Sequence, residues 1–369
     1  MILTRRDFGK LAATALPIAA IPSARLLAAA KPNSLFNGVQ IGAITYSFRA
    51  LPSSAQETLK YCVDCGISAI ELMSNVAESY AGSPMQAGRG GAGGPGGPPG
   101  AGGPPGGAQG AARQAGAGAQ GAAGAPGQRG QGGGRQPLTP EQEAARRKQA
   151  EEIKNWRLSV PMSKYKAFRK MYEDAGVKIY AFKLPPTLEM SDAEYEYIWN
   201  VGETLGANHI TMELPTDDKL LQRVADYAAK RKLMIAFHTH GQGGSSGFDR
   251  VLGASKYTAL NFDVGHYYGV NGESPVPLVE KYHERIASLH LKDRKGPGSG
   301  GENRGGPGGG GPNMPWGQGE TPLKEVLQLM KRNRYKFLAS IEYEYNTPEG
   351  SDVLTEIKKC VKYCKDALA

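Results

Sequence analysis

The chain has 369 residues, 40% of them hydrophobic, which is enough apolar sequence for one large domain or two of medium size. Its 51 glycines and 25 prolines exceed the content of an ordinary globular chain, and the excess is concentrated in two segments. The formal net charge is +9, but part of it comes from the N-terminal residues and from arginines of an acid-free glycine-rich segment. A nucleic-acid-binding protein is therefore not expected.

Residues 1–30 begin with an arginine pair in the arrangement Thr-Arg-Arg-Asp-Phe-Gly-Lys, followed by a modest apolar stretch and three small residues. This pattern resembles a twin-arginine export signal. The apolar stretch, roughly Leu11 to Ile21, is too short to span about 30 Å of hydrocarbon, so no stable membrane anchor is expected. We expect a periplasmic or secreted protein whose mature chain begins near Lys31.

Two segments, residues 82–136 and 296–313, consist mainly of glycine, proline, alanine and other small or polar residues. They hold almost no large apolar side chain, so burial cannot offset the entropy lost on ordering them. The glycines lack the strict three-residue period of a collagen helix. We expect two disordered insertions within a single domain that covers residues 31–369.

Short apolar runs rich in β-favouring residues alternate along the chain with amphipathic segments. Strands are expected at 39–47, 68–74, 177–185, 208–215, 233–240, 259–266, 286–293 and 337–345. Helices are expected at 54–66, 159–176, 191–207, 219–232, 322–334 and 352–368, with Ser191 as one N-cap. This alternation predicts a parallel sheet, and eight repeats predict its closed form, the (β/α)8 TIM barrel. A doubly wound open sheet is the alternative, but no strand precedes a G-x-G-x-x-G or G-x-x-x-x-G-K-[ST] motif.

Four cysteines fall in two pairs on predicted helices, Cys62 with Cys65 and Cys360 with Cys364. The simplest interpretation is that they are small core residues. A four-thiolate zinc site is an alternative, although C-x3-C is poor spacing for half of it. In an oxidising compartment, a disulfide between the first and last helices is a further alternative.

Polar residues gather at the ends of the later predicted strands, which is where a (β/α)8 enzyme carries its chemistry. They are His238, His240, His266, His290, Glu213, Asp263, Lys292, Asp293, Glu342 and Glu344. A single histidine at a strand end is usually a hydrogen-bonded structural residue, but several on adjacent strands would be costly to bury without a function. Imidazoles and carboxylates converging from different strands predict a divalent metal site for Mn, Co, Zn or Mg.

Five short stretches lie in or next to predicted strands: ELMS at 71–74, FHTHGQG at 237–243, NFDVGH at 261–266, HLKD at 290–293 and IEYE at 341–344. Together they resemble the xylose isomerase-like TIM barrels, a family that includes sugar phosphate isomerases and epimerases. The resemblance runs from about residue 38 to residue 369, apart from the insertions. It implies a metal ion held by Asp263, His290 and Glu342.

The family commonly supplies a fourth ligand as a glutamate at the end of the fifth strand, where this sequence has His238. Two arrangements follow. His238 can take the ligand place, or Glu213 from the preceding strand end can reach the metal while His238 acts beside it as the catalytic base. The second arrangement is slightly favoured, because a carboxylate at Glu213 keeps an acidic residue on each side of the substrate.

The resemblance implies proton abstraction next to a carbonyl, with the metal as Lewis acid and an enediolate intermediate. His238, Glu213 and Glu342 are the candidate catalytic residues, and His240, His266, Lys292, Lys183 and Trp316 are candidate contacts to the sugar. Export disfavours phosphorylated metabolites, so the expected substrate is a small non-phosphorylated sugar. The alternatives are a 3-keto-glycoside lyase or hydratase using the same enolisation, a phosphodiesterase acting on damaged DNA, and a non-catalytic sugar-binding protein. The oligomeric state is left open, and a homo-oligomer is one possibility.

Overall fold

The computed structural model describes residues 31–84, 139–241, 244–299 and 310–369. The expected export signal, residues 1–30, lies outside the described residues. The same holds for nearly all of the segment 82–136 and for the central part, 300–309, of the segment 296–313.

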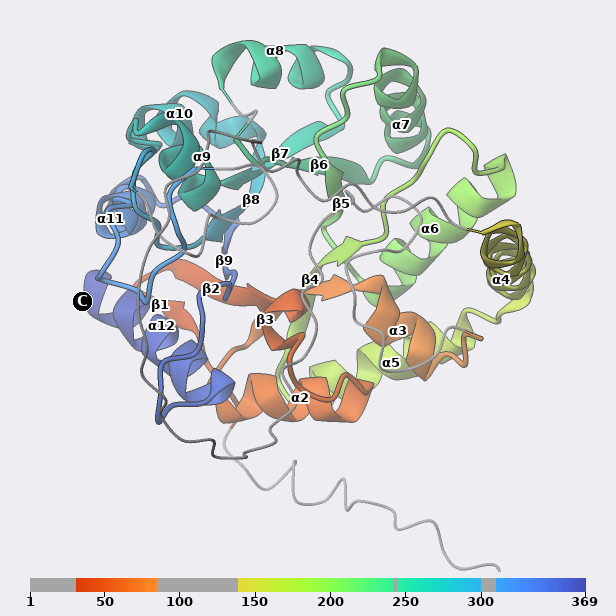
Figure 1. Cartoon of the computed structure of the whole chain (residues 1–369), viewed down its shortest axis with the longest axis horizontal. Coiled ribbons are helices and arrows are strands. Elements are labelled where there is room, and N and C mark those ends of the chain that lie inside the picture. Colours follow the sequence, from red (N-terminus) through yellow and green to blue (C-terminus); the bar gives the residue numbers. More distant parts are fainter. Residues whose placement is uncertain (1–30, 85–138, 242–243, 300–309) are drawn as a thin grey trace, which may run out of the picture.

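Eight parallel strands close into a barrel with helices around it, as Figure 1 shows. Each strand pairs with the next along the chain, and pairing of the first with the last closes the sheet. The prediction of a (β/α)8 TIM barrel is confirmed. A two-residue strand that was not predicted, β1 (Leu35–Phe36), pairs antiparallel with the first barrel strand. The barrel strands are β2 (Val39–Ile44), β3 (Ala69–Met73), β4 (Lys178–Lys183), β5 (His209–Glu213), β6 (Met234–His238), β7 (Thr258–Asp263), β8 (Ile286–Leu291) and β9 (Leu338–Ile341).

Six helices correspond to the predicted ones, and their ends follow from local capping chemistry. The hydroxyl of Ser191 accepts a hydrogen bond from the Glu194 backbone, and the Glu194 carboxylate accepts one from the Ser191 backbone. The same helix stops at Gly206, whose φ of 74° suits glycine. These six are α2 (Ala55–Asp64), α5 (Ser163–Asp174), α6 (Asp192–Leu205), α7 (Asp218–Arg231), α11 (Leu323–Asn333) and α12 (Val353–Ala367).

Five further α-helices of the described residues were not predicted, because they are short or lack a clear apolar stripe. Within the described chain, no helix combines the length and apolar character needed to cross a bilayer. The predicted strand 259–266 ends at Asp263, since the Asp263 carboxylate accepts a hydrogen bond from the backbone of His266 and starts a helix there. The five helices are α3 (Ser74–Tyr80), α4 (Pro140–Ser159), α8 (Ser245–Gly253), α9 (Val264–Asn271) and α10 (Val276–Tyr282).

A buried ion pair joins the polar helix α4 to the rest of the domain, beside the edge-on packing of Trp156 against Tyr197. Arg157 donates from Nε and Nη2 to the two oxygens of Glu78 on α3, at 2.8 and 3.0 Å. Tyr197 on α6 donates to the same carboxylate at 2.9 Å. All three side chains are buried. Because breaking a buried pair leaves an unpaired charge, this contact ties α3, α4 and α6 together.

All four cysteines are buried free thiols. Burial raises the pKa of each, to about 12 for Cys65. The interpretation as core residues is confirmed. Among the described residues, the cysteines form neither the disulfide nor the zinc site that the sequence left open.

The inside of the barrel contains a polar layer beneath the carboxyl ends of the strands. His209 at the start of β5 is fully buried, with Nε2 3.0 Å from the Ser288 hydroxyl of β8. Burial lowers the pKa of His209 from 6.5 to about 4, so the folded protein holds this ring neutral.

We predict that His209→Gln reduces the loss of stability on mild acidification. Between pH 6.5 and 4 the unfolded chain binds a proton at His209 that the folded chain does not, so stability falls as the pH falls through this window. From about pH 7 to about pH 5, the variant should lose on the order of 2 kcal/mol less unfolding free energy than the wild type. Urea unfolding at both pH values measures this, and equal losses would contradict the expectation.

Candidate functional site

Strand register brings the sequence-predicted residues together at the carboxyl end of the barrel. Glu213 at the end of β5 lies opposite His238 at the end of β6. Asp263 at the end of β7 lies opposite His290 on β8. Glu342 directly follows β9. Side chains at matching positions of neighbouring strands share a face of the sheet, so these groups point to one region.

Four of these residues form a compact cluster. His238, Asp263, His290 and Glu342 each offer a ligand atom, and these atoms all lie within 4.8 Å of one another. All four side chains are buried. His238 Nδ1 is buried and has no hydrogen-bond partner within the described structure, so a lone pair or proton there is unused. Two imidazoles and two carboxylates are a donor set suited to a divalent transition metal, and the cluster fits such an ion.

Glu213 lies beside this cluster and is not a member of it. Its Oε1 accepts a hydrogen bond from Lys183 Nζ at 2.9 Å. Its Oε2 lies 3.6 Å from His240 Nε2 and accepts no hydrogen bond from the described residues. The side chain is 25% exposed, more than any member of the cluster. Of the two arrangements that the sequence left open, the geometry therefore favours His238 as the fourth ligand, against the sequence-based choice of Glu213.

His290 is held between two carboxylates. Its Nδ1 lies 2.6 Å from Glu342 Oε2, and its Nε2 lies 2.6 Å from Glu71 Oε2. Burial disfavours a charged imidazole, but the two carboxylates outweigh burial and raise the pKa of His290 to about 10. Burial also disfavours the Glu71 charge, and His290 outweighs it, lowering the pKa of Glu71 to about 2. Both groups stay charged across the neutral range in this arrangement.

Glu71 is a site residue that the sequence analysis did not single out. It lies on β3 and is fully buried. It also accepts hydrogen bonds from Thr211 Oγ1 at 2.7 Å and Asn261 Nδ2 at 3.1 Å. The signal was present in the stretch SAIELMS, where one acidic residue stands inside an otherwise apolar strand.

Lys292 neutralises the acidic side of the cluster. Its Nζ lies 2.6 Å from Glu344 and 3.1 Å from both Asp263 and Glu342. Burial would lower the pKa of Lys292, but the three carboxylates outweigh it and raise the pKa. Burial raises the pKa of Asp263, whereas for Glu342 Lys292 and His290 outweigh burial and hold the pKa well below its usual range. The ammonium is closest to Glu344, which is outside the four-residue cluster.

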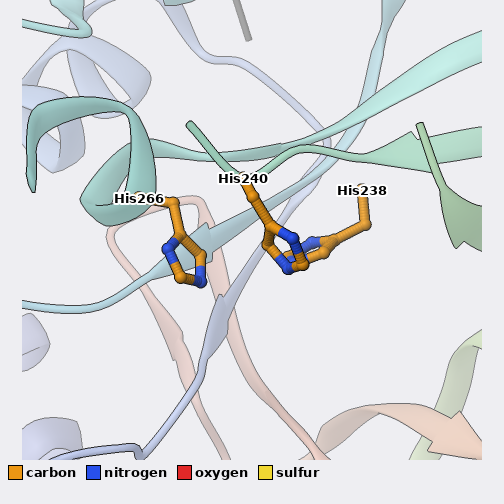
Figure 2. Close-up of side chains that lie close together, drawn as sticks. All are labelled: His238, His240 and His266. Carbon is orange, nitrogen blue, oxygen red and sulfur yellow. The ribbon is translucent and has the colours of Figure 1, made fainter. Parts of the chain in front are cut away.

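His238, His240 and His266 form a second group whose ring nitrogens lie within 4.8 Å of one another, shown in Figure 2. Arg294, a buried residue that the sequence analysis also missed, donates from Nη1 to His266 Nδ1 at 2.7 Å. A guanidinium only donates, so Nδ1 accepts and the neutral ring carries its proton on Nε2. Burial lowers the pKa of His266 well below 6.5. His266 thus presents an N–H and no lone pair, and the four-residue cluster is the better metal site.

The two remaining predicted contacts differ in position. Lys183 at the end of β4 joins the site through its ion pair with Glu213. Trp316 packs edge-on against Tyr363 of α12, with ring centroids 5.6 Å apart. The loop that carries Trp316 is anchored by Asp293, whose Oδ2 accepts hydrogen bonds from the backbone of Gly317 and Gly319 at 2.8 and 2.9 Å. The contacts of Trp316 support a packing role.

Comparison with known proteins supports the resemblance seen in the sequence. Residues 219–363 match the family model described as xylose isomerase-like TIM barrel. A stretch of 78 residues is 32% identical to an inosose dehydratase from Clostridium botulinum. This match covers 20% of the present chain and 26% of that relative, so it spans about a quarter of the relative's length.

The chain is also similar to solved structures at low sequence identity. A probable 3-DHS dehydratase involved in petrobactin synthesis, from Bacillus anthracis, is 13% identical, with a TM-score of 0.50 over 88% of this chain and 98% of the other. A sugar phosphate isomerase/epimerase from Parabacteroides distasonis is 14% identical, with a TM-score of 0.47 over 88% and 93%. The first of these similarities supports the barrel fold.

We predict that the protein binds a single divalent ion per chain. His238→Ala should abolish tight Zn²⁺ binding, because it removes one of four ligands. His240→Ala is a matched control from the same strand end and should retain the ion, since His240 lies outside the four-residue cluster. Equilibrium dialysis with elemental analysis measures both. Loss of zinc in His240→Ala would favour the three-histidine group instead. Retention of zinc in His238→Ala would contradict both groups, since His238 belongs to each of them.

Proposed function

We propose that the protein is a metal-dependent sugar isomerase or epimerase that removes a proton from the carbon next to a carbonyl. The observation that carries this proposal is the cluster of His238, Asp263, His290 and Glu342, with the carboxylate of Glu213 beside it. A divalent cation (Mn, Co, Zn or Mg) held by these four residues would supply Lewis-acid polarisation of the carbonyl. The remaining tasks, which are proton transfer and substrate orientation, fall to side chains around the cluster.

Glu213 is the proposed proton acceptor. His238 was the sequence-based choice for the base, but as a ligand it has no lone pair to spare at the bound nitrogen. Burial also lowers the pKa of His238 well below 6.5. Glu213 has an oxygen, Oε2, that accepts no hydrogen bond from the described residues, while Lys183 fixes its other oxygen. A carboxylate that is fixed at one oxygen and open at the other is positioned to take a proton.

His240 and Glu342 complete the proposed proton transfer. His240 Nε2 lies 3.6 Å from Glu213 Oε2, close enough to pass a proton to or from it after a small movement. Glu342 follows β9, on the far side of His290 from Glu71, and contributes the second carboxylate that an epimerase needs on the other face of the substrate. The enediolate formed by proton removal is then protonated at the neighbouring carbon or on the opposite face.

The charge pairing of the site supports a substrate without phosphate. Lys183 is paired with Glu213, and Lys292 is paired with three carboxylates. A phosphate would have to compete with these carboxylates for the two lysines. The Nε2–H of His266 is suited to donate to a neutral hydroxyl or carbonyl oxygen. Export through the proposed signal at residues 1–30 would also bring the enzyme to sugars that carry no phosphate.

A second candidate function is elimination, as in a dehydratase or in a lyase or hydratase acting on 3-keto-glycosides. The observation that favours it is the local similarity to an inosose dehydratase, 32% over 78 residues. Proton abstraction is the same in both reactions, but here the enediolate expels a leaving group from the next carbon. His240 and His266, with ring centroids 4.6 Å apart, are the proposed donors to that leaving group.

We predict that Glu213→Gln lowers kcat by about 10²–10⁴-fold, the usual contribution of a positioned general base, while zinc binding is retained. Glu189→Gln, at an exposed position in the loop after β4, is the control and should keep full activity. Turnover of ketohexoses and of 3-keto-glucosides measures the effect. An active Glu213→Gln enzyme would exclude Glu213 as the base.

The same assay separates the two candidate reactions. Isomerised or epimerised ketohexose supports the first, and released aglycone from a 3-keto-glucoside supports the second. Both depend on the cluster, so removal of metal by a chelator should abolish either activity. Turnover that survives the chelator would contradict both proposals.

A further inference from the structure

Glu71 has no part in the proposed proton transfer, yet it is a fully buried carboxylate next to His290 of the cluster. It is fully buried on β3, inside the barrel. A buried carboxylate is costly unless it is paired, and an apolar or amide side chain at this position would avoid that cost. The presence of a buried carboxylate in a strand of apolar residues therefore calls for a role that a neutral side chain would not fill.

Both oxygens of Glu71 are fixed by neighbours on three other strands. Oε1 accepts from Thr211 Oγ1 of β5 at 2.7 Å. Oε2 accepts from Asn261 Nδ2 of β7 at 3.1 Å and lies 2.6 Å from His290 Nε2 of β8. The hydrogen bonds from Thr211 and Asn261 fix the position of the Glu71 carboxylate independently of His290. His290 Nε2 therefore lies against an acceptor that is held in place.

The two ring nitrogens of His290 face different surroundings. Nδ1 lies 2.6 Å from Glu342, which belongs to the four-residue cluster. Nε2 lies against Glu71, which does not. Because a carboxylate only accepts, the contact with Glu71 requires a proton on Nε2. By the same rule Nδ1, at the same distance from Glu342, carries a proton in the metal-free protein. A cation held by the cluster would replace that proton and bind the lone pair of Nδ1, while Nε2 keeps its proton for Glu71.

We propose that Glu71 is a positioning residue that holds the proton of His290 on Nε2, so that Nδ1 is the atom offered to the metal. The inference rests on the proposed metal cluster and adds to it the ligating atom and the residue that selects it. A carboxylate that accepts the other N–H of a ligating histidine fixes the ring orientation and makes the ligand more basic. Glu71 also places a negative charge behind the ligand, which favours a cation in front of it.

The direct test uses the wild-type protein loaded with Zn²⁺ and labelled with ¹⁵N at histidine. Long-range proton–nitrogen NMR identifies which ring nitrogen of His290 carries a proton, with the His290→Ala spectrum used for assignment. We expect a protonated Nε2 and a metal-bound Nδ1. A metal-bound Nε2 with the proton on Nδ1 would overturn the inference. This measurement does not depend on any Glu71 variant folding.

A matched pair of variants tests the consequence for affinity. Glu71→Gln keeps the size of the side chain and removes its charge, and it should weaken Zn²⁺ binding by about 10–100-fold, as for other partners of ligating histidines. Glu78→Gln removes an equally buried carboxylate that pairs with Arg157 away from the cluster. It should lower the thermal stability and leave Zn²⁺ affinity unchanged. Unchanged affinity in Glu71→Gln, or an equal loss in Glu78→Gln, would overturn the inference.

Three outcomes distinguish failure of the proposed role of Glu71 from failure of the proposed function. If the wild-type protein binds no divalent ion, the proposed function and the role of Glu71 are both overturned. If it binds zinc through His238, Asp263 and Glu342 but His290 ligates through Nε2, only the role of Glu71 is lost. If Nδ1 ligates but no sugar is turned over, the role of Glu71 stands and the proposed reaction is overturned.

Discussion

Asp263 and Glu342 are two buried carboxylates at the carboxyl end of the barrel, and an oxygen of one lies within 4.8 Å of an oxygen of the other. Two negative charges this close together require a positive charge between them. The strand β8 and the residue after it supply that charge. Lys292 lies 3.1 Å from each carboxylate, and His290 lies 2.6 Å from Glu342. Without these cations the two acids would repel each other in a region that water does not screen.

This charge pairing ties the chemistry of the site to the register of the sheet. Asp263 comes from β7, Glu342 follows β9, and the cations come from the strand between them. A shift of one residue in β8 would turn His290 to the outer face and leave both carboxylates unpaired. The same register places Asn261 beside His238 and beneath the cluster, where it meets Glu71. The register that closes the barrel is therefore also the register that assembles the site. The polar side chains inside the barrel lower the stability of the fold relative to an apolar interior.

The sequence predicted the barrel because alternation of apolar runs and amphipathic segments depends only on local periodicity. The sequence also predicted that Asp263, His290 and Glu342 lie together at one end of the barrel, since the carboxyl ends of parallel barrel strands share one rim. It did not predict α4, because that helix is mostly polar and is joined to the domain by the Glu78–Arg157 pair, a contact between distant residues. It extended one strand to His266, whereas the side chain of Asp263 ends that strand as a helix cap.

The choice between Glu213 and His238 could not be made from the sequence. Both stand at strand ends on the same face, and which of them reaches the cluster depends on the barrel's dimensions and on competing partners. Lys183 donates a hydrogen bond to Glu213 and holds it beside the cluster. No local sequence pattern predicts that contact. Glu71 and Arg294 were missed for a related reason, because their importance comes from partners more than 25 residues away.

His238, Asp263, His290 and Glu342 are proposed to hold one divalent cation while Glu213 lies beside it. Anomalous diffraction at the zinc edge from crystals soaked in Zn²⁺ tests this most directly. We expect one strong peak per chain at about 2.0–2.2 Å from a donor atom of each of the four residues, with Glu213 outside that distance. A peak ligated by Glu213 in place of His238, or one held by the ring nitrogens of His240 and His266, would contradict it.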